Sequence, residues 1–192
     1  TNLNKICFTA KRDVLTTTTL ITNKDFAFMA FVFRCAFRGA SFFFFFFSMR
    51  DIKYIVIHCT AGNAQEPTKT LKDYFKKVLG WKAYGYHIVV NADGTWDRLT
   101  EDEDIANGVK GHNHESIHIS WKGGSDLKDT RTMAQKKTLR DLVMQYRRKY
   151  PKATILGHRD LSPDLNGDGK ITSVDWIKFC PCFDAKAEYR GI

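Results

Sequence analysis

The sequence predicts a compact α/β domain that begins near Met49. Three observations predict this fold class. A short β-branched and aromatic run, Tyr54 to Ile57, is typical of a buried strand. The segment Asn91 to Gly94 has the composition of a hairpin turn between two strands. A long stretch after Thr132 carries apolar residues at helical spacing, which predicts an amphipathic helix.

The expected elements are strands and helices in alternating groups along the chain. Strands are expected at residues 53–58, 86–90, 95–99, 116–121 and 154–157. Helices are expected at residues 70–79 and 132–150, where apolar residues recur at helical spacing. Gly80 ends the first helix and Pro151 ends the second. Thr132 and Gln135 form a capping box at the start of the second helix.

Charge and cysteine content limit the classes of protein to consider. The formal net charge of +9 would permit nucleic-acid binding, and it would equally attract an anionic polymer such as a bacterial cell wall. Because the basic residues are scattered among acidic ones without an Arg-rich run, no nucleic-acid partner is expected. The odd number of cysteines indicates no disulfide framework, so at least one thiol serves another purpose. The five cysteines are Cys7, Cys35, Cys59, Cys180 and Cys182.

Residues 1–48 differ in composition from the rest of the chain. Twelve of the fifteen Phe residues lie there, and the only acidic residues are Asp13 and Asp25. The apolar segment 26–47 is interrupted by Arg34 and Arg38, so no stable membrane span is expected. It also lacks a convincing signal-peptide cleavage site. We favour a non-native extension upstream of a start at Met49, ahead of a degenerate export segment or anchor, and ahead of an ordered part of the fold.

Two histidines and a cysteine form the candidate metal set. His58 ends the first expected strand, and His158 follows the last one. Two imidazoles and one thiolate are typical ligands of a catalytic zinc that keeps one position open for water. Cys59 is a poor candidate, because adjacent residues of a strand point to opposite faces. Cys180 and Cys182 could share a side, and we favour Cys180 because Pro181 fixes its exit.

Four motifs in this order carry a resemblance to a known family: Ile57-His58-Cys59-Thr60-Ala61, Gly85-Tyr86-His87, Gly157-His158-Arg159-Asp160 and Lys178-Phe179-Cys180-Pro181-Cys182-Phe183-Asp184. They resemble the zinc-dependent N-acetylmuramoyl-L-alanine amidases, which include phage lysozymes of the amidase type and are related to the peptidoglycan recognition proteins. The resemblance covers nearly all of residues 49–192. It implies a mixed central β-sheet flanked by helices, in a single amidase domain that is expected to be a monomer.

The resemblance also implies a substrate and a set of site residues. The substrate would be bacterial peptidoglycan, cut by zinc-activated water between N-acetylmuramic acid and L-alanine, so the protein would act at the cell wall. His58, His158 and Cys180 would hold Zn²⁺, with Tyr86 and Lys178 as catalytic groups. The alternative function is a module that binds muropeptides without cutting them, and the presence of Cys180 argues against it.

The roles of Tyr86 and Lys178 agree with the chemistry of amide hydrolysis. Lys178 lies two residues before Cys180, so in an extended segment it would point to the same side and could donate to an oxyanion. Tyr86 could hydrogen-bond the water or the leaving nitrogen. The plainer interpretations are a core aromatic side chain for Tyr86 and a solvated surface charge for Lys178.

One departure from the family pattern concerns the strand at residues 116–121. Some members carry a glutamate near its end as a general base, where this chain has Ser120. A mechanism that depends on Tyr and Lys is therefore favoured. His87 is interpreted as structural. Three further histidines, His112, His114 and His118, either line the groove or are polar surface residues.

A second motif lies between His158 and Cys180. The twelve residues from Asp164 to Asp175, called the EF-hand-like loop below, follow the calcium-binding pattern, with Gly169 at position 6 and Ile171 at position 8. The loop predicts a possible Ca²⁺ site, and the alternative is a polar turn without metal. It also raises a third function, a calcium-responsive interaction protein, which the lack of a paired loop makes less favoured. The candidate ligands are Asp164, Asn166, Asp168, Lys170, Thr172 and Asp175.

Overall fold

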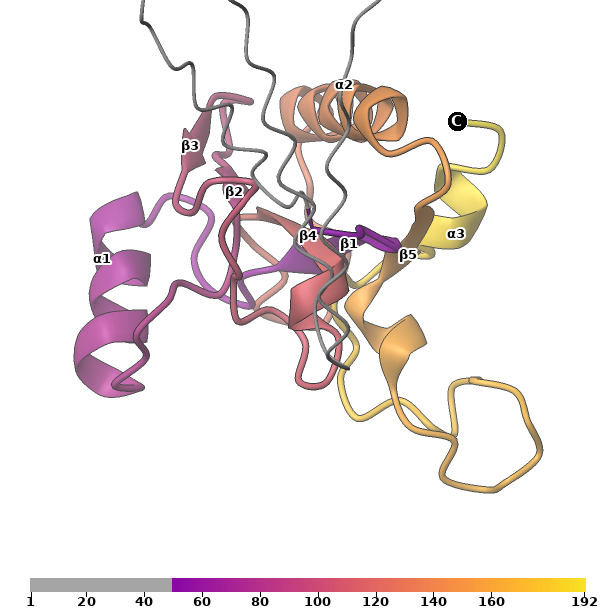
Figure 1. Cartoon of the computed structure of the whole chain (residues 1–192). Helices are drawn as coiled ribbons and strands as arrows, with labels where there is room; N and C mark the ends of the chain where they lie inside the picture. Colours follow the sequence, from indigo (N-terminus) through magenta and orange to yellow (C-terminus); the bar gives the residue numbers. More distant parts are fainter. Residues whose placement is uncertain (1–49) are drawn as a thin grey trace, which may run out of the picture. The chain divides into compact units, whose positions relative to one another are not determined.

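The computed structural model describes residues 50–192, which contain a five-stranded sheet and several helices (Figure 1). The sequence interpretation of residues 1–48 lies outside this part of the chain. The strands are β1 (Tyr54–Cys59), β2 (Ile88–Val90), β3 (Trp96–Arg98), β4 (Ser116–Trp121) and β5 (Thr154–Gly157). The α-helices are α1 (Thr68–Asp73), α2 (Met133–Lys149) and α3 (Ala185–Glu188). Shorter helical turns are η1 (Tyr74–Val78), η2 (Asn113–Glu115) and η3 (His158–Leu161).

The sheet is mixed, as expected, with the strand order β3-β2-β4-β1-β5. β1 runs parallel to both of its neighbours, β4 and β5, and β2 runs parallel to β4. Only β3 is antiparallel, since it is joined to β2 by the hairpin turn. The carboxyl ends of four parallel strands therefore meet at one edge of the sheet, which is where open α/β sheets bind ligands.

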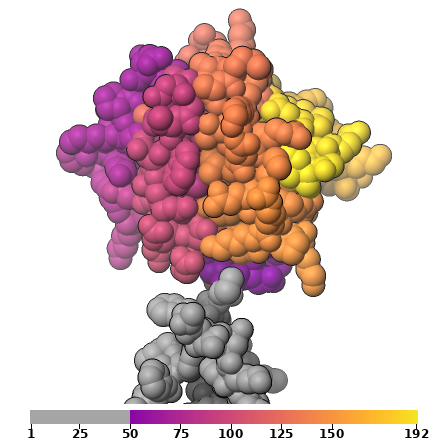
Figure 2. All heavy atoms as spheres, turned by 90° about the horizontal axis from the view of Figure 1, so that it is seen from above, coloured from indigo at the N-terminus to yellow at the C-terminus, as the bar shows by residue number. Residues whose placement is uncertain are grey.

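The two faces of the sheet have different cores. On one face Ile55, Ile57 and Cys59 of β1 join a large cluster with Leu139 and Val143 of α2. Figure 1 shows α2 lying over this face, and in Figure 2 its orange atoms lie between the magenta atoms of earlier residues and the yellow C-terminal atoms. Because side chains alternate along a strand, His58 belongs to the opposite face, where Val56 packs with Leu156 in a smaller cluster.

The capping box of α2 is present as expected. The Thr132 hydroxyl accepts a hydrogen bond from the Gln135 backbone N–H, and the Gln135 side chain accepts one from the Thr132 N–H, both at 3.0 Å. The buried Gln135 amide also donates to the carbonyl oxygens of Val90 and Lys122. One side chain therefore ties the start of α2 to the ends of β2 and β4.

Several predicted boundaries are wrong by a few residues. The helix expected at residues 70–79 begins as α1 at Thr68 and continues after Asp73 as the π-helical turn η1. β2 begins at Ile88 rather than at residue 86, and β1 extends to Cys59. The short η2, η3 and α3 were missed, because three or four residues are too few to show a helical period. Within residues 50–192, no helix has the length and apolarity needed to cross a bilayer.

Candidate metal centre

His58 and His158 lie side by side because their strands are neighbours. Ile57 of β1 is in register with Gly157 of β5, and each histidine follows directly after these paired residues. The two imidazole rings are 4.8 Å apart between centroids. His58 is fully buried, whereas His158 remains partly exposed at the start of η3. The carboxyl edge of the sheet thus brings together two residues that are 100 positions apart in the chain.

Cys180 approaches this pair from the C-terminal segment. Its sulfur accepts a hydrogen bond from the Cys59 backbone N–H at 3.2 Å and lies 3.7 Å from His58 Nδ1. Its carbonyl oxygen accepts from the Arg159 N–H at 2.9 Å, next to His158. Gly157 makes this close approach possible, since a Cβ there would lie 2.5 Å from Cδ of Pro181. The glycine before His158 is therefore part of what brings Cys180 to the site.

The ligand atoms of His58, His158 and Cys180 all lie within 4.8 Å of one another. Among residues 50–192, no other group of three or more His, Cys, Asp or Glu residues brings its ligand atoms together in this way. The sequence predicts these three residues as zinc ligands, and the structure brings them together at one end of the sheet. They are the residues that could hold a metal ion.

Burial keeps the two imidazoles neutral. It lowers the pKa of His58 well below its ordinary value, and the neighbouring His158 lowers it further. Burial, together with the positive charge of Lys178, lowers the pKa of His158 to about 4. At neutral pH both rings therefore carry a free lone pair, which a metal ligand requires.

The other two thiols of the region face each other. The sulfurs of Cys59 and Cys182 are 3.5 Å apart, on the α2 side of β1. The pKa of Cys59 is raised by its contact with Cys180 and by burial, and burial raises the pKa of Cys182 to about 12. These two thiols therefore contact each other on the face of β1 opposite to the candidate metal site. Of the three thiols in this region, the sulfur of Cys180 lies near both histidines, and its role as a metal ligand stays a prediction.

Tyr86 lies close to the candidate ligands. Its hydroxyl donates to the carbonyl oxygen of Cys59 at 3.3 Å, and its ring lies 5.2 Å from the His58 ring. Burial raises the pKa of the Tyr86 hydroxyl, so it remains a proton-bearing donor at neutral pH. Lys178 is exposed, and its positive charge lowers the pKa of both His58 and His158, which places its charge near the site.

The histidines left open by the sequence have different positions. His118 is fully buried in β4, and its Nδ1 lies 3.1 Å from His58 Nε2. His87 is also buried, and its Nδ1 accepts the backbone N–H of His118 at 3.0 Å. His112 instead pairs with Glu115 at 3.2 Å, and His114 is in the exposed turn η2. The contact of His118 with His58 was missed, because it depends on the pairing of β1 with β4.

Ser120, which stands near the end of β4 where some family members carry a glutamate, lies beside His58. The register pairs His58 of β1 with Ser120 of β4. The Ser120 hydroxyl is buried and has no hydrogen-bond partner within the described residues. A serine side chain has no carboxylate to act as a general base, so proton transfer here depends on other groups.

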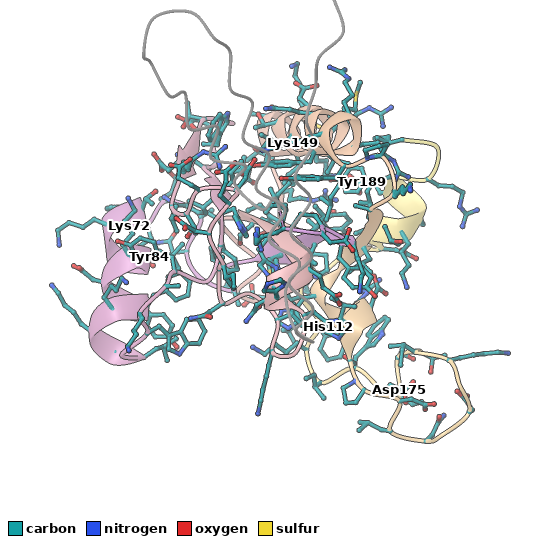
Figure 3. The ribbon with its side chains drawn as sticks, viewed as in Figure 1. Lys72, Tyr84, His112, Lys149, Asp175 and Tyr189 are labelled. Atoms are coloured by element: carbon teal, nitrogen blue, oxygen red, sulfur yellow. The ribbon has the colours of Figure 1, made fainter. Side chains whose placement is uncertain are left out.

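The EF-hand-like loop extends away from the sheet (Figure 1) and is closed by its own hydrogen bonds. The Asp164 carboxylate accepts from the N–H groups of Gly167 and Gly169, at 2.7 and 2.8 Å. Asp175, labelled in Figure 3, is buried, and its carboxylate accepts from the N–H groups of Thr172 and Leu165. These bonds lower the pKa of Asp175. The loop carboxylates do not converge as the His-His-Cys set does, so calcium binding stays a prediction.

A groove of about 410 Å³ lies next to the segment that follows β1. Lys122, which lines the groove, donates to the Glu66 carbonyl oxygen at 2.7 Å. The residues that line the groove come from the loop after β1, from α1 and from the end of β4. They are Thr60, Ala61, Gly62, Asn63, Glu66, Pro67, Thr70, Leu71, Tyr74 and Lys122.

Comparison with known families decides the identity of the chain. The sequence model of the N-acetylmuramoyl-L-alanine amidase family matches residues 48–170. The chain belongs to this family. The matched range contains His58, Tyr86 and His158, but it ends before Lys178 and Cys180. The amidase is a peptidoglycan hydrolase that cleaves the amide bond between N-acetylmuramic acid and L-alanine.

Relatives of the amidase include phage endolysins. This chain is 29% identical to the endolysin of Escherichia phage T7 over 138 residues, which cover 69% of this chain and 82% of the relative. An endolysin of Klebsiella phage KP32 is 28% identical over 143 residues, covering 71% and 85%. An uncharacterized protein of Haemophilus influenzae is 48% identical over 96 residues, covering 48% of this chain and 83% of the relative.

Solved structures agree with the fold. The Ph2119 endolysin of a Thermus scotoductus bacteriophage superposes with a TM-score of 0.57 at 26% identity, covering 68% of the amidase and 77% of that chain. The peptidoglycan recognition protein PGRP-SA of Apis mellifera superposes with a TM-score of 0.56 at 15% identity, covering 73% and 82%. At that low identity, the likeness to PGRP-SA concerns the fold alone. The mixed sheet flanked by helices is therefore confirmed.

Proposed function

We propose that the amidase is a zinc enzyme whose metal is held by His58, His158 and Cys180. The observation that carries the proposal is the convergence of their ligand atoms to within 4.8 Å of one another. Tetrahedral zinc with bonds of about 2.0–2.1 Å to nitrogen and about 2.3 Å to sulfur separates two such ligand atoms by about 3.6 Å. The 3.7 Å between His58 Nδ1 and Cys180 Sγ fits that separation.

The donor set also fits a catalytic rather than a structural zinc. Two neutral imidazoles and one thiolate leave one tetrahedral position for water or substrate. When bound, zinc would supply Lewis acidity, which polarises an amide carbonyl and makes water a better nucleophile. His158 is partly exposed, so solvent and substrate can approach the ligands from its side.

Tyr86 and Lys178 are proposed to stabilise the transition state of amide cleavage. Attack on the amide places negative charge on the carbonyl oxygen, and a nearby donor or cation lowers the energy of that charge. The Tyr86 hydroxyl, held beside His58 at the Cys59 carbonyl, is such a donor. The exposed Lys178 supplies a positive charge whose field already reaches both histidines.

The groove from Thr60 to Lys122 is proposed to bind peptidoglycan next to the reacting amide. Its lining begins at Thr60, two residues after His58, which supports a place for substrate near the proposed metal ligands. The site of action would then be the bacterial cell wall. The protein is proposed to work as a monomer, with residues 49–192 as a self-sufficient amidase domain.

The EF-hand-like loop is proposed to bind calcium as a second, non-catalytic metal. Support comes from its oxygen-bearing side chains at the loop positions that ligate calcium, and from the carbonyl of Lys170 at the position that uses a backbone oxygen. Its carboxylates would repel one another if drawn together without a cation. Calcium would relieve that repulsion and would fix the segment that connects His158 to Cys180.

A product analysis separates the proposed enzyme from its alternatives. Purified peptidoglycan is incubated with the full chain, with and without a zinc chelator, and the soluble products are identified by mass spectrometry. The expected products are stem peptides with a free L-alanine amino terminus, formed only in the presence of about one equivalent of zinc. Binding to peptidoglycan without new amino termini would instead support the non-cutting module. Cleavage that the chelator leaves unchanged would contradict the zinc proposal.

A further inference from the structure

His118 lies against His58 on the face of the sheet opposite α2. β4 pairs with β1 so that His118 is in register with Val56, and its side chain therefore shares a face with Val56 and His58. The ring is fully buried. Its Nδ1 lies 3.1 Å from His58 Nε2, which is hydrogen-bonding distance between two imidazoles.

The two nitrogens of His58 have different partners. Nδ1 faces the sulfur of Cys180 at 3.7 Å, whereas Nε2 faces His118. A nitrogen that ligates a metal must offer its lone pair, so His58 must carry its single proton on Nε2. That N–H then donates to Nδ1 of His118. His118 consequently carries its own proton on Nε2.

The surroundings hold His118 in this orientation. Its backbone N–H donates to His87 Nδ1 at 3.0 Å, while His87 Nε2 lies 3.2 Å from the carbonyl oxygen of Asp104. Gly108 packs directly against the ring, and a Cβ at that position would overlap with His118. The fully buried ring therefore has close contact with the backbone at Gly108.

The second ring nitrogen of His118, Nε2, faces away from His58. His118 Nε2 is buried and has no hydrogen-bond partner in residues 50–192. A buried donor without a partner is unfavourable, and native structures contain few of them. Among the described residues, the contact with His58 is the one hydrogen bond that the His118 side chain makes.

We propose that His118 is a positioning residue that holds His58 as the Nε2–H tautomer and aims its Nδ1 at the metal. This inference rests on the proposed zinc site and deepens it. Metal-binding histidines commonly donate their second N–H to such a partner, and loss of the partner typically costs about 10–100-fold in metal affinity or activity. His118 touches neither metal nor substrate in this account and acts only through His58.

Zinc affinity of the full chain tests the proposal with a matched set of variants. His118→Phe keeps a planar ring without the acceptor, and His118→Asn offers its amide oxygen near the position of Nδ1. Ser116→Ala is the control, because Ser116 is buried in the same strand and its hydroxyl makes no hydrogen bond within the described part. Competition with a chromophoric chelator should show zinc binding about 10–100-fold weaker in His118→Phe. His118→Asn should lie between it and the wild type, and Ser116→Ala should equal the wild type.

The outcomes separate this inference from the zinc proposal itself. Wild-type zinc affinity in His118→Phe would overturn the positioning role and leave the zinc site intact. A wild-type chain that binds no zinc would overturn the proposed zinc site and the inference with it. Should His118→Phe fail to fold, nitrogen-15 NMR of the metal-free wild type decides. His58 is expected to be protonated at Nε2 and not at Nδ1, and the opposite tautomer would overturn the proposal.

Discussion

At the scale of single residues, three neighbouring thiols differ in what surrounds them. Cys180 Sγ lies near His58 Nδ1, whereas the sulfurs of Cys59 and Cys182 lie 3.5 Å from each other. The alternation of side chains along a strand was enough to exclude Cys59 as a metal ligand on sequence grounds. The choice between Cys180 and Cys182 rested on Pro181 and on the family resemblance, because a local pattern does not encode how an irregular loop turns.

The residues around His58 also show which contacts a sequence can predict and which it cannot. Both candidate ligand histidines could be selected from the sequence, since each lies at or just after the end of a recognisable strand. The contact between His58 and His118 could not, because it requires knowing that β1 and β4 are adjacent and in which register. The same register places Ser120 beside His58, a neighbour that the sequence alone could not predict.

Loss of either proposed transition-state group should slow turnover. Tyr86→Phe removes the hydroxyl beside His58, and Lys178→Met removes the charge near both histidines. Removal of one such donor typically costs a factor of about 100–1,000 in kcat. We expect reductions of that order, with zinc still bound, in a steady-state assay on muropeptides combined with metal analysis.

Two conservative changes elsewhere provide controls for that prediction. Tyr84 lies near Lys72, as Figure 3 shows, and Tyr84→Phe should leave kcat unchanged. Lys152 is exposed in the turn before β5, and Lys152→Met should also be neutral. Near-normal kcat in both Tyr86→Phe and Lys178→Met would contradict the proposed transition-state role and indicate a structural role for both residues.

At the scale of elements, length decided what the sequence could predict. β1, β4 and α2 were found because their apolar patterns extend over several residues, whereas the short β2 and β3 were found from the hairpin signal between them. The capping box of α2 was predicted from Thr132 and Gln135 alone. The turns η2 and η3 and the helix α3 have no such pattern. Yet η3 begins with His158, so an element that the sequence could not predict presents one of the candidate ligands.

The EF-hand-like loop gives a prediction at this scale. If calcium binds only to the folded form, the melting temperature of the full chain should rise with calcium concentration. Asp164→Ala combined with Asp168→Ala should abolish that rise, since these carboxylates occupy two ligand positions. Differential scanning fluorimetry with calcium, and with magnesium as a comparison ion, measures the effect.

The control for the loop is a charge change outside it. Asp126→Ala removes an exposed carboxylate after β4 and should leave the calcium response unchanged. If calcium shifts neither the melting temperature nor the amidase activity of the wild type, the loop is a turn closed by its own Asp hydrogen bonds. The connection between His158 and Cys180 would then be fixed by protein contacts alone.

At the scale of the whole molecule, the sheet topology explains why residues from distant positions meet. Parallel pairing of β5 with β1 and of β1 with β4 places His158, His58 and His118 near one edge. The sequence predicted each strand and the class of the sheet. The strand order became available only from the structure, because pairing depends on contacts between residues far apart in the chain.

Buried histidines should make folding stability depend on pH. Burial, and then the charge of Arg50, lower the pKa of His87 from 6.5 to about 4. The unfolded state therefore binds more protons than the folded state between those values, so stability falls as the pH falls through this range. The loss attributable to His87 is on the order of 3 kcal/mol. Urea unfolding of the metal-free chain between pH 7 and pH 4 measures it.

His87→Asn is the matched variant for the pH prediction. The amide cannot titrate in this range, and its oxygen can accept the His118 N–H in place of His87 Nδ1. The variant should lose less stability than the wild type when the pH is lowered. An identical pH dependence in the two proteins would show that His87 titrates normally in the folded state.

The zinc content of two single-cysteine variants tests the central claim most directly. Cys180→Ser and Cys182→Ser exchange the same atom two residues apart, so they differ mainly in which sulfur faces His58. We expect Cys182→Ser to retain about one equivalent of zinc and amidase activity, and Cys180→Ser to lose both, as measured by elemental analysis of the purified chains. Retention of zinc by Cys180→Ser together with its loss from Cys182→Ser would contradict the His58, His158 and Cys180 site.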